Sequence, residues 1–464
     1  MPRREWVAFA SLFAALLFIL SDAFWGQGAR GFDRRSNRGK PNIVFILTDD
    51  ERADSLGVMQ NVRRLLAARG VTFTNAFVTT SLCCPSRTSI LTGLYSRHTG
   101  VYSNRPPDGG APAFHDRSTA ATWLHRAGYT TGLIGKYLNR YPLLGRRYVP
   151  PGWDEWDTYA SEPEINFYGG YTLNENGLLV RYGTLPVDYS TPVLTRKAVR
   201  FVQTAPQPFF LYFAPNAPHL PSLPSPRDRG RLRGTAIRVP PSFGEADLTD
   251  KPWGSGETPF TPAIDRRLLR LHRRMLESLL AVDRSVAQIV DTLKQRGALS
   301  NTIIVFTSDN GYLLGEHRLA EKGWPYDESI RVPLVIRVPW ASRGRTDSHL
   351  VLNIDFAPTF AALAGIRPGL HEDGRNLVPL LAGRDPPWRG AFVVEYLGDQ
   401  WDGGPPRFEA VRTERYLYVE YRNGWRELYD LKADPFELEN MAQLPGTRAL
   451  RSELSRKLHV LIGS

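Results

Sequence analysis

The segment Asn42-Ile-Val-Phe-Ile-Leu47, followed at once by Thr48-Asp49-Asp50, decides the fold class. It is a short apolar run, rich in β-branched residues, that stops abruptly at polar residues. This pattern is typical of a strand buried on both faces of a parallel sheet. Similar runs alternate with helical patterns along the chain, so we expect an α/β fold with a large, mostly parallel sheet sandwiched by helices.

Three more apolar runs end in polar residues. Thr302–Thr307 stops at Ser308-Asp309-Asn310-Gly311, Thr131–Gly135 runs into Lys136, and Phe209–Phe213 leads into a loop that contains His219. Ligands of open α/β sheets bind beyond the carboxyl ends of the strands. We therefore expect these endings to meet at one rim of the sheet, although Asp49 and Asp309 are far apart in the chain.

Two segments carry helical patterns that end at glycine. Met59–Arg69 precedes Gly70, and the long amphipathic stretch Asp265–Arg296 precedes Gly297. Glycine just after a periodic segment is a common helix stop, so both segments are predicted to be helices that cover the sheet.

The pattern changes near residue 388. Alternating apolar and polar residues then predict an antiparallel sheet, and a helix is predicted near the C-terminus. We expect a catalytic domain over residues 41–387 and a small C-terminal antiparallel α+β subdomain over residues 388–464. The expected elements are strands at Ala391–Tyr396, Arg412–Tyr421 and Trp425–Tyr429 and a helix at Thr447–Leu461.

Residues 1–40 resemble a targeting segment. Arg3 and Arg4 precede an apolar run, Trp6–Leu20, and the small residues Ser21–Ala23. This order is typical of an export signal peptide, or of an N-terminal anchor with a linker. The sequence contains no Asn-x-Ser/Thr glycosylation site and only two cysteines. We therefore expect a protein secreted or held in the cell envelope, and a bacterial origin is favoured.

The net charge favours anionic partners. Subtracting 47 acidic from 58 basic residues gives +11. Sulfated or phosphorylated substrates, nucleic acids and membrane surfaces all suit this charge. Nucleic acid is disfavoured because the basic residues form no recognisable nucleic-acid-binding motif. The sequence leaves the oligomeric state open.

A reactive cysteine is suggested by Ser81-Leu-Cys83-Cys84-Pro85-Ser86-Arg87, which leads to Thr92-Gly93. Pro85 near the start and Gly93 at the end predict a short helix with Cys83 at its N-terminus. A helix N-terminus favours an anion or a negatively charged nucleophile. Cys83 could thus be a thiolate nucleophile beside Arg87, or a buried structural cysteine.

The motif Cys83-x-Pro85-Ser86-Arg87 resembles the signature of the sulfatase family, in the alkaline-phosphatase-like superfamily. Asp49-Asp50 and Asp309-Asn310-Gly311 occur in the family's order. The resemblance implies that a formylglycine-generating enzyme oxidises Cys83 to formylglycine (3-oxoalanine). Among sulfatases, Gly135–Asn139 and Asp309–Tyr312 are most similar to the N-acetylglucosamine-6-sulfatase and heparan endosulfatase group.

The resemblance also implies a metal site and a reaction. Asp49, Asp50, Asp309, Asn310 and modified residue 83 would supply oxygen ligands that suit Ca²⁺, with Mg²⁺ as an alternative. The hydrated aldehyde of residue 83 would attack the sulfur of a sulfate ester, and a sulfated carbohydrate is the expected substrate. Its second hydroxyl would then expel sulfate from the covalent sulfo-enzyme.

Several cationic residues take roles by resemblance. Arg87 would hold the formylglycine and the metal ligands, Lys136 and Lys322 would bind the sulfate, and His219 would protonate the leaving oxygen. His317 is a further candidate for substrate binding.

One position departs from the family pattern. Many sulfatases have a histidine two residues after the strand-end lysine, as base for the elimination, whereas Leu138 stands here. His98 and His115 are candidates for that base, and Tyr137 and Asn139 are candidates for lining the substrate pocket.

Two other functions remain open. A phosphonate or phosphate ester hydrolase of the same superfamily would use the same nucleophile, and a non-catalytic binder of sulfated glycans would use the positive charge. A two-zinc phosphatase is disfavoured because no histidines surround Asp49 and Asp309.

Overall fold

The computed structural model describes residues 39–161, 167–252, 260–399 and 404–463. The predicted export signal lies almost entirely outside these ranges. Within them, no helix has both the length and the apolar character needed to cross a membrane.

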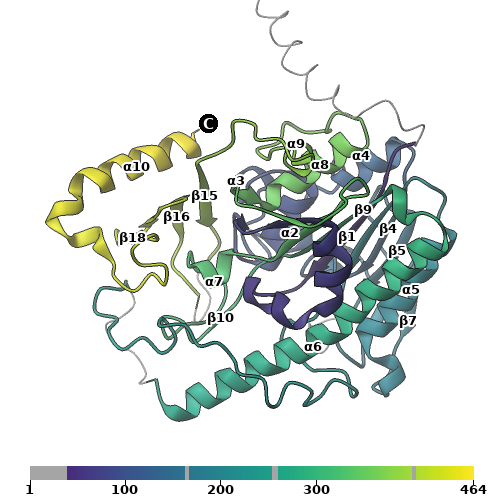
Figure 1. Ribbon diagram of the computed structural model, residues 1–464, viewed down its shortest axis with the longest axis horizontal. Coiled ribbons are helices and arrows are strands. Elements are labelled where there is room, and N and C mark those ends of the chain that lie inside the picture. The colour runs from purple at the N-terminus through teal and green to yellow at the C-terminus, as the bar shows by residue number, and fades with distance from the viewer. Residues whose placement is uncertain (1–38, 162–166, 253–259, 400–403, 464) are drawn as a thin grey trace, which may run out of the picture.

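A ten-stranded sheet forms the centre of the molecule (Figure 1). Its strand order is β13-β2-β12-β9-β1-β8-β4-β5-β6-β7. The middle five strands, from β9 to β5, are parallel, and antiparallel strands flank them. In chain order the strands are β1 (Asn42–Thr48), β2 (Gly70–Phe73), β4 (Thr130–Gly135), β5 (Glu155–Tyr159), β6 (Thr172–Glu175), β7 (Leu178–Arg181), β8 (Phe209–Ala214), β9 (Thr302–Ser308), β12 (Leu334–Arg337) and β13 (Arg345–Asp347).

The four strands predicted from apolar runs are confirmed as the parallel centre of this sheet. β1 lies between β8 and β9, and β4 pairs with the other side of β8. The mostly parallel α/β architecture is therefore confirmed.

Helices cover both faces of the sheet. Side chains of β1 alternate between the faces: Phe45 packs on one side and Val44 and Ile46 on the other. α2 (Cys83–Thr92), α4 (Ala120–Arg126) and α8 (Phe356–Leu363) contribute to the first face, and α5 (Ser190–Thr204) and α6 (Pro262–Gln295) to the second. Burial on both sides explains why the strands read as continuous apolar runs.

The predicted helix over Met59–Arg69 is wrong in detail. The structure has a 3₁₀ segment at Ala53–Val58, a π-helical segment at Val62–Leu66 and a 3₁₀ turn at Ala67–Arg69. Asp283 of α6 accepts hydrogen bonds from the backbone amides of residues 61 and 62, which begins the π-helical segment there. Gly70 caps the last 3₁₀ turn, as expected of a helix stop, and also starts β2, where a Cβ would lie 2.2 Å from the carbonyl oxygen of Ile336.

A second, four-stranded antiparallel sheet is built from the C-terminal residues. α10 packs its Leu454 and Leu458 against Val411 and Leu428 of this sheet. The small antiparallel α+β part is thus confirmed, whereas its boundary at residue 388 stays a prediction. The elements are β15 (Ala391–Tyr396), β16 (Phe408–Thr413), β17 (Tyr416–Tyr421), β18 (Arg426–Asp430) and α10 (Arg448–Ile462).

The predicted strand Arg412–Tyr421 is two strands. Thr413 and Tyr416 bound a tight turn, and the hydroxyl of Thr413 accepts a hydrogen bond from the backbone amide of Tyr416 at 2.7 Å. Apolar and polar residues alternate in the same way in both strands, so the alternation in the sequence does not reveal the turn.

Short elements connect these layers. The helices are α3 (Ser96–Thr99), α7 (Asp327–Ile330) and α9 (Val378–Leu381), and the strands are β3 (Ala76–Phe77), β10 (Leu313–Leu314), β11 (Ala320–Glu321) and β14 (Val351–Leu352). Further 3₁₀ turns span Ala111–Ala113, Tyr141–Leu144, Pro186–Asp188, Leu299–Asn301, Asn353–Asp355, Met441–Gln443 and Pro445–Thr447.

A buried histidine on α6 predicts a pH dependence of stability. Burial lowers the pKa of His272 to about 4, and the nearby Arg52 guanidinium acts in the same direction. The unfolded chain, with a histidine pKa near 6.5, binds the proton first, so stability falls as pH drops from 6.5 towards 4. At pH 5 the loss is roughly 2 kcal/mol.

We expect His272→Gln to remove this part of the acid sensitivity. Urea unfolding at pH 5 and pH 7.5 measures it as the difference in unfolding free energy between the two pH values. The same difference in the variant and the parent protein would contradict the prediction.

Candidate active site

Four polar strand endings do meet at one rim of the large sheet. Thr48 and Ser308 are register partners on β1 and β9, so Asp49 and Asp309 leave the sheet side by side. The backbone amide of Asp50 donates to Oδ1 of Asp309 at 3.1 Å. The parallel register therefore joins residues that are distant in the chain.

Three carboxylates are gathered at this rim. Asp49, Asp50 and Asp309 are at most 1% exposed, and each offers an oxygen within 4.8 Å of the others. Asp50 has a positive φ of 68°, an uncommon conformation for a residue other than glycine. Such backbone strain persists where surrounding contacts impose it, and it is often found at functional sites.

The donor set fits a hard divalent cation. Asn310 donates its amide to Oδ1 of Asp50 at 2.7 Å, while its own Oδ1 is buried and lacks a hydrogen-bond partner among the described residues. Three carboxylates with an unused amide oxygen are ligands that Ca²⁺ or Mg²⁺ prefers. Asp49, Asp50, Asp309 and Asn310 could therefore hold such an ion.

Cationic side chains compensate the carboxylates. Nζ of Lys136 lies 2.6 Å from Asp49, and Lys322 forms an ion pair with Asp50. Burial opposes ionisation of Asp49, yet Lys136, His219 and Arg87 together hold its pKa well below the usual range. Asp49 is therefore an anion at neutral pH.

Arg87 links the third carboxylate to the rest of the group. Its Nε lies 2.7 Å from Asp309, and its Nη1 donates to the carbonyl oxygen of Lys136 at 2.8 Å. Burial raises the pKa of Asp309 to about 6. Arg87 opposes this shift, whereas repulsion by the nearby Asp49 adds to it. Each of the three carboxylates thus has a cationic partner, namely Lys136, Lys322 or Arg87.

Cys83 begins α2 and lies inside this charged group. Its Sγ is 2.9 Å from Nζ of Lys322 and 3.4 Å from Oδ1 of Asp49. Burial raises the pKa of the thiol far above its usual range despite the two lysines. An unmodified Cys83 is therefore a neutral thiol and a poor nucleophile.

Pro85, expected at the first helical position, is instead the third residue of the helix.

His219 closes the more open side of the site. Its side chain is 23% exposed, compared with 6% for Lys136 and 8% for Lys322. Its Nδ1 lies 2.7 Å from the carbonyl oxygen of Leu220. A carbonyl can only accept, so Nδ1 carries the proton and Nε2, 3.8 Å from Asp50, faces the site.

His317 lies in a different group of side chains from the residues around Cys83. Its Nδ1 bonds to Glu245 at 2.6 Å, and it groups with Glu328 and Glu437. Its expected contact with the substrate stays a prediction.

The candidates for the elimination base lie in other surroundings. Nδ1 of His98 contacts Asp373 at 2.7 Å, and His115 is exposed. Leu138 is a buried core residue. Tyr137, expected near the pocket, packs its ring against Trp156 with centroids 5.0 Å apart, so the ring belongs to the hydrophobic core.

Sequence reasoning missed residues that hold the site from outside. Oδ1 of Asn104 accepts a hydrogen bond from the backbone amide of Cys84 at 2.8 Å, and the hydroxyl of Tyr168 donates to the carbonyl of His219 at 2.6 Å. Neither residue lies in a recognisable motif, and only the tertiary fold brings them there.

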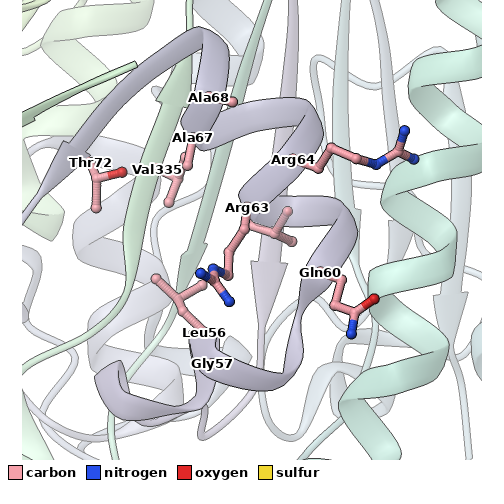
Figure 2. Close-up of a pocket in the computed structure, with 10 residues that line it drawn as sticks. Leu56, Gly57, Gln60, Arg63, Arg64, Ala67, Ala68, Thr72 and Val335 are labelled. Carbon is pink, nitrogen blue, oxygen red and sulfur yellow. The ribbon is translucent and has the colours of Figure 1, made fainter. Parts of the chain in front are cut away.

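A separate surface hollow lies over the short helical segments that follow β1 (Figure 2). Figure 2 shows Arg63, Arg64 and Gln60 projecting from these turns beside a mostly apolar lining that includes Leu56 and Val335. None of the residues around Cys83 lines it. It is therefore distinct from the candidate site.

The fold and the site define a sulfatase. The sequence profile of the family named Sulfatase matches residues 41–366, and this chain belongs to that family. A second profile, named N-sulphoglucosamine sulphohydrolase, C-terminal, matches residues 315–463.

Relatives include N-acetylglucosamine-6-sulfatase of Homo sapiens, which is 32% identical over 93% of this chain and 85% of its own length. The extracellular sulfatase SULF-1 homolog of Drosophila melanogaster is 34% identical over 88% of this chain but only 38% of its own length. A Caenorhabditis elegans relative is covered over 54% of its length. The chain thus spans about half or less of these two. Relatives are both eukaryotic and bacterial, so they do not favour the expected bacterial origin.

Solved structures are similar over most of the chain. One, of a protein in complex with its substrate D-glucosamine-2-N,6-O-disulfate, has a TM-score of 0.78 and 27% identity, covering 91% of this chain and 97% of that one. A phosphonate monoester hydrolase of Agrobacterium radiobacter has a TM-score of 0.75 and 25% identity, covering 91% and 95%.

Gly135 determines how closely Lys136 approaches the site. It has a φ of 122°, and a Cβ there would lie 2.0 Å from the carbonyl oxygen of Ala214 on β8. We expect Gly135→Ala to separate the ends of β4 and β8 and to destabilise the protein by at least about 1–3 kcal/mol. Thermal or urea unfolding measures the change.

Gly446→Ala is the matched control, because a Cβ there meets no atom within 4 Å and the backbone φ is not in the left-handed region. It should change stability by less than about 0.5 kcal/mol. Equal stabilities of the two variants would show that the close approach at Gly135 is unimportant.

Proposed function

We propose that this chain hydrolyses sulfate esters of a sulfated sugar. The observation that carries the proposal is the position of Cys83, at the N-terminus of α2, among three carboxylates and two lysines. Family membership supports the same reaction class. We further propose a 6-O-sulfated glucosamine unit as substrate, because relatives are named N-acetylglucosamine-6-sulfatase and a similar structure contains a glucosamine 6-O-sulfate.

The proposed reaction needs two groups that the unmodified chain does not itself contain, a bound metal ion and a formylglycine. Asp49, Asp50, Asp309 and Asn310 would hold Ca²⁺, with Mg²⁺ as the alternative, and a formylglycine-generating enzyme would convert Cys83. The ion supplies Lewis-acid charge and the formylglycine supplies the nucleophilic oxygen. The high pKa of the unmodified thiol supports modification, because the thiol itself is a weak nucleophile.

Lys136 and Lys322 would bind the sulfate group. Each Nζ pairs with a carboxylate of the proposed metal site, and the remaining N–H donors of each ammonium group would bind the sulfate oxygens. Both side chains are nearly buried, and a charge in such surroundings acts more strongly on a substrate than in water. Arg87 stays paired with Asp309 and acts by positioning it.

His219 would donate a proton to the departing sugar oxygen. Its Nδ1 keeps a proton on the Leu220 carbonyl, so the proton for the sugar oxygen would come from Nε2–H of the doubly protonated ring, which would become neutral in that step. Its greater exposure supports a position of the sugar on this side of the site. The sulfate would then lie deeper, between Lys136 and Lys322.

Export and domain division belong to the same proposal. Residues 1–40 would direct the chain out of the cytoplasm, and relatives named as extracellular sulfatases support export. Residues 41–387 would form the catalytic domain, and residues 388–464 the subdomain that borders it.

Conversion of Cys83 is testable with two variants. Protein produced with the modifying enzyme should carry an aldehyde at residue 83 by peptide mass spectrometry and hydrolyse an aryl sulfate in a Ca²⁺-dependent way. Cys83→Ala should lower kcat by at least about 10³-fold, since the covalent step is lost.

Cys84→Ala is the matched control, because Cys84 is equally buried and adjacent but does not bond to the carboxylates. It should keep most of the activity. An unmodified thiol in an active enzyme, or equal losses in both variants, would overturn the assigned nucleophile.

The rival reaction differs in the atom attacked. A phosphonate monoester hydrolase shares this fold at 25% identity. With 4-nitrophenyl sulfate and 4-nitrophenyl phenylphosphonate, which share a leaving group, we expect the higher kcat/KM for the sulfate. A higher value for the phosphonate would favour the rival, and no turnover of either ester by modified, Ca²⁺-loaded protein would favour a non-catalytic glycan binder.

A further inference from the structure

A second group of potential ligands lies between the two sheets. His317 comes from the connection between β10 and β11, Glu328 from α7, and Glu437 from the segment after β18. Each offers one nitrogen or oxygen within 4.8 Å of the others. In Figure 1, α7 and β10 lie between the large sheet and the C-terminal strands, where these segments meet.

His317 has the arrangement of a metal-ligating histidine. It is fully buried, and its Nδ1 lies 2.6 Å from Oε2 of Glu245. A carboxylate holds the proton on Nδ1, which leaves a lone pair on Nε2, as is usual for histidines whose other nitrogen binds a metal. Nε2 has no hydrogen-bond partner within the described ranges of the chain.

Glu437 offers a second unused atom. Its side chain is buried, and Oε2 accepts a hydrogen bond from the backbone amide of Asp327 at 3.1 Å. Its Oε1 is buried without a partner in the part of the chain that the structure describes. Glu437 also has a positive φ of 57°, so the backbone is held in an uncommon conformation there. Two separate buried side chains thus leave an atom unsatisfied in one group.

The surrounding cations are already paired. Lys251 lies 3.5 Å from Glu245 and 3.2 Å from Asp250, and Arg412 lies 3.0 Å from Asp327. No ion pair with Glu328 or Glu437 is found among the described residues.

We propose that His317, Glu328 and Glu437 bind a divalent transition-metal ion of the Zn²⁺ or Mn²⁺ class. One imidazole and two carboxylates suit such ions, whereas the oxygen-only group at Asp49 suits Ca²⁺. Two ligand atoms of a tetrahedral zinc ion lie roughly 3.4 Å apart, and the donor atoms here lie within 4.8 Å of one another, so side-chain movements of up to about 1.5 Å would close the site. Glu328 is the only partly buried residue of the three.

The ion would cross-link two segments of the chain and so stabilise the fold. It would tie the segment after β18 to the chain between residues 317 and 328, which contains Lys322. Lys322 contacts Cys83, so this cross-link would help to position a lysine of the proposed active site. The site goes beyond the proposed sulfatase reaction and gives His317 a role other than substrate binding.

The test is metal binding, independent of turnover. The full chain is stripped with a chelator, saturated with Ca²⁺ to fill the Asp49 group, and titrated with Zn²⁺ alone or Mn²⁺ alone. We expect about one tightly bound transition-metal ion per chain by elemental mass spectrometry, together with a rise in Tm. No such ion in the parent protein would overturn the proposal.

Variants locate the ion. His317→Gln and Glu437→Gln should lose the bound Zn²⁺ and its Tm rise but keep Ca²⁺ binding, and Glu245→Gln should weaken Zn²⁺ binding about 10–100-fold by releasing the His317 ring. Asp309→Asn should do the reverse, losing Ca²⁺ and keeping Zn²⁺. His349→Gln, a histidine outside both groups, is the matched control and should bind both ions.

Unchanged Zn²⁺ content in both His317→Gln and Glu437→Gln would overturn the proposed site. The absorption spectrum of the Co²⁺-substituted parent protein provides a check that needs no variant. Bands typical of mixed nitrogen and oxygen ligation are expected, and a spectrum of hydrated Co²⁺ would contradict the proposal. Loss of sulfatase activity alone decides nothing about this site, because the readouts are ion content and Tm.

Discussion

The mutual repulsion of Asp49, Asp50 and Asp309 is the constraint on which the site depends. Three buried carboxylates within 4.8 Å cannot all ionise without compensation. Lys136, Lys322 and Arg87 each pair with one of these carboxylates, and a bound cation would add to this compensation. Oxygen ligands gathered in this way suit a doubly charged ion such as Ca²⁺ or Mg²⁺.

Packing between the two sheets supports this site from behind. Tyr326, next to α7, donates to Glu427 of β18 at 2.8 Å, and Arg412 of β16 pairs with Asp327. The segment that carries Lys322 is therefore held by the C-terminal sheet as well as by the rim. This connection explains how a small antiparallel sheet, distant from the nucleophile in sequence, can influence the geometry around Cys83.

The two ligand groups of the molecule differ in chemistry. The group at Asp49 offers oxygen atoms alone, and the group at His317 combines an imidazole with Glu328 and Glu437. Both contain buried polar atoms without partners among the described residues, namely Oδ1 of Asn310 in the first and Nε2 of His317 in the second. The oxygen-only group would therefore prefer Ca²⁺ or Mg²⁺, and the group with an imidazole would prefer an ion such as Zn²⁺.

The central strands and the polar residues that follow them could be identified from the sequence alone. Runs such as Asn42–Leu47 are readable because strands buried on both faces are apolar throughout, and the residues that follow them are local in the chain. The irregular turns at residues 53–69 and the split strand at Arg412–Tyr421 were not readable, since Asp283 and the hairpin act there. Which side chains share a site was decided only by the tertiary structure: His317 is near Lys322 in sequence but pairs with Glu245, because contacts depend on the packing of distant segments and not on spacing along the chain.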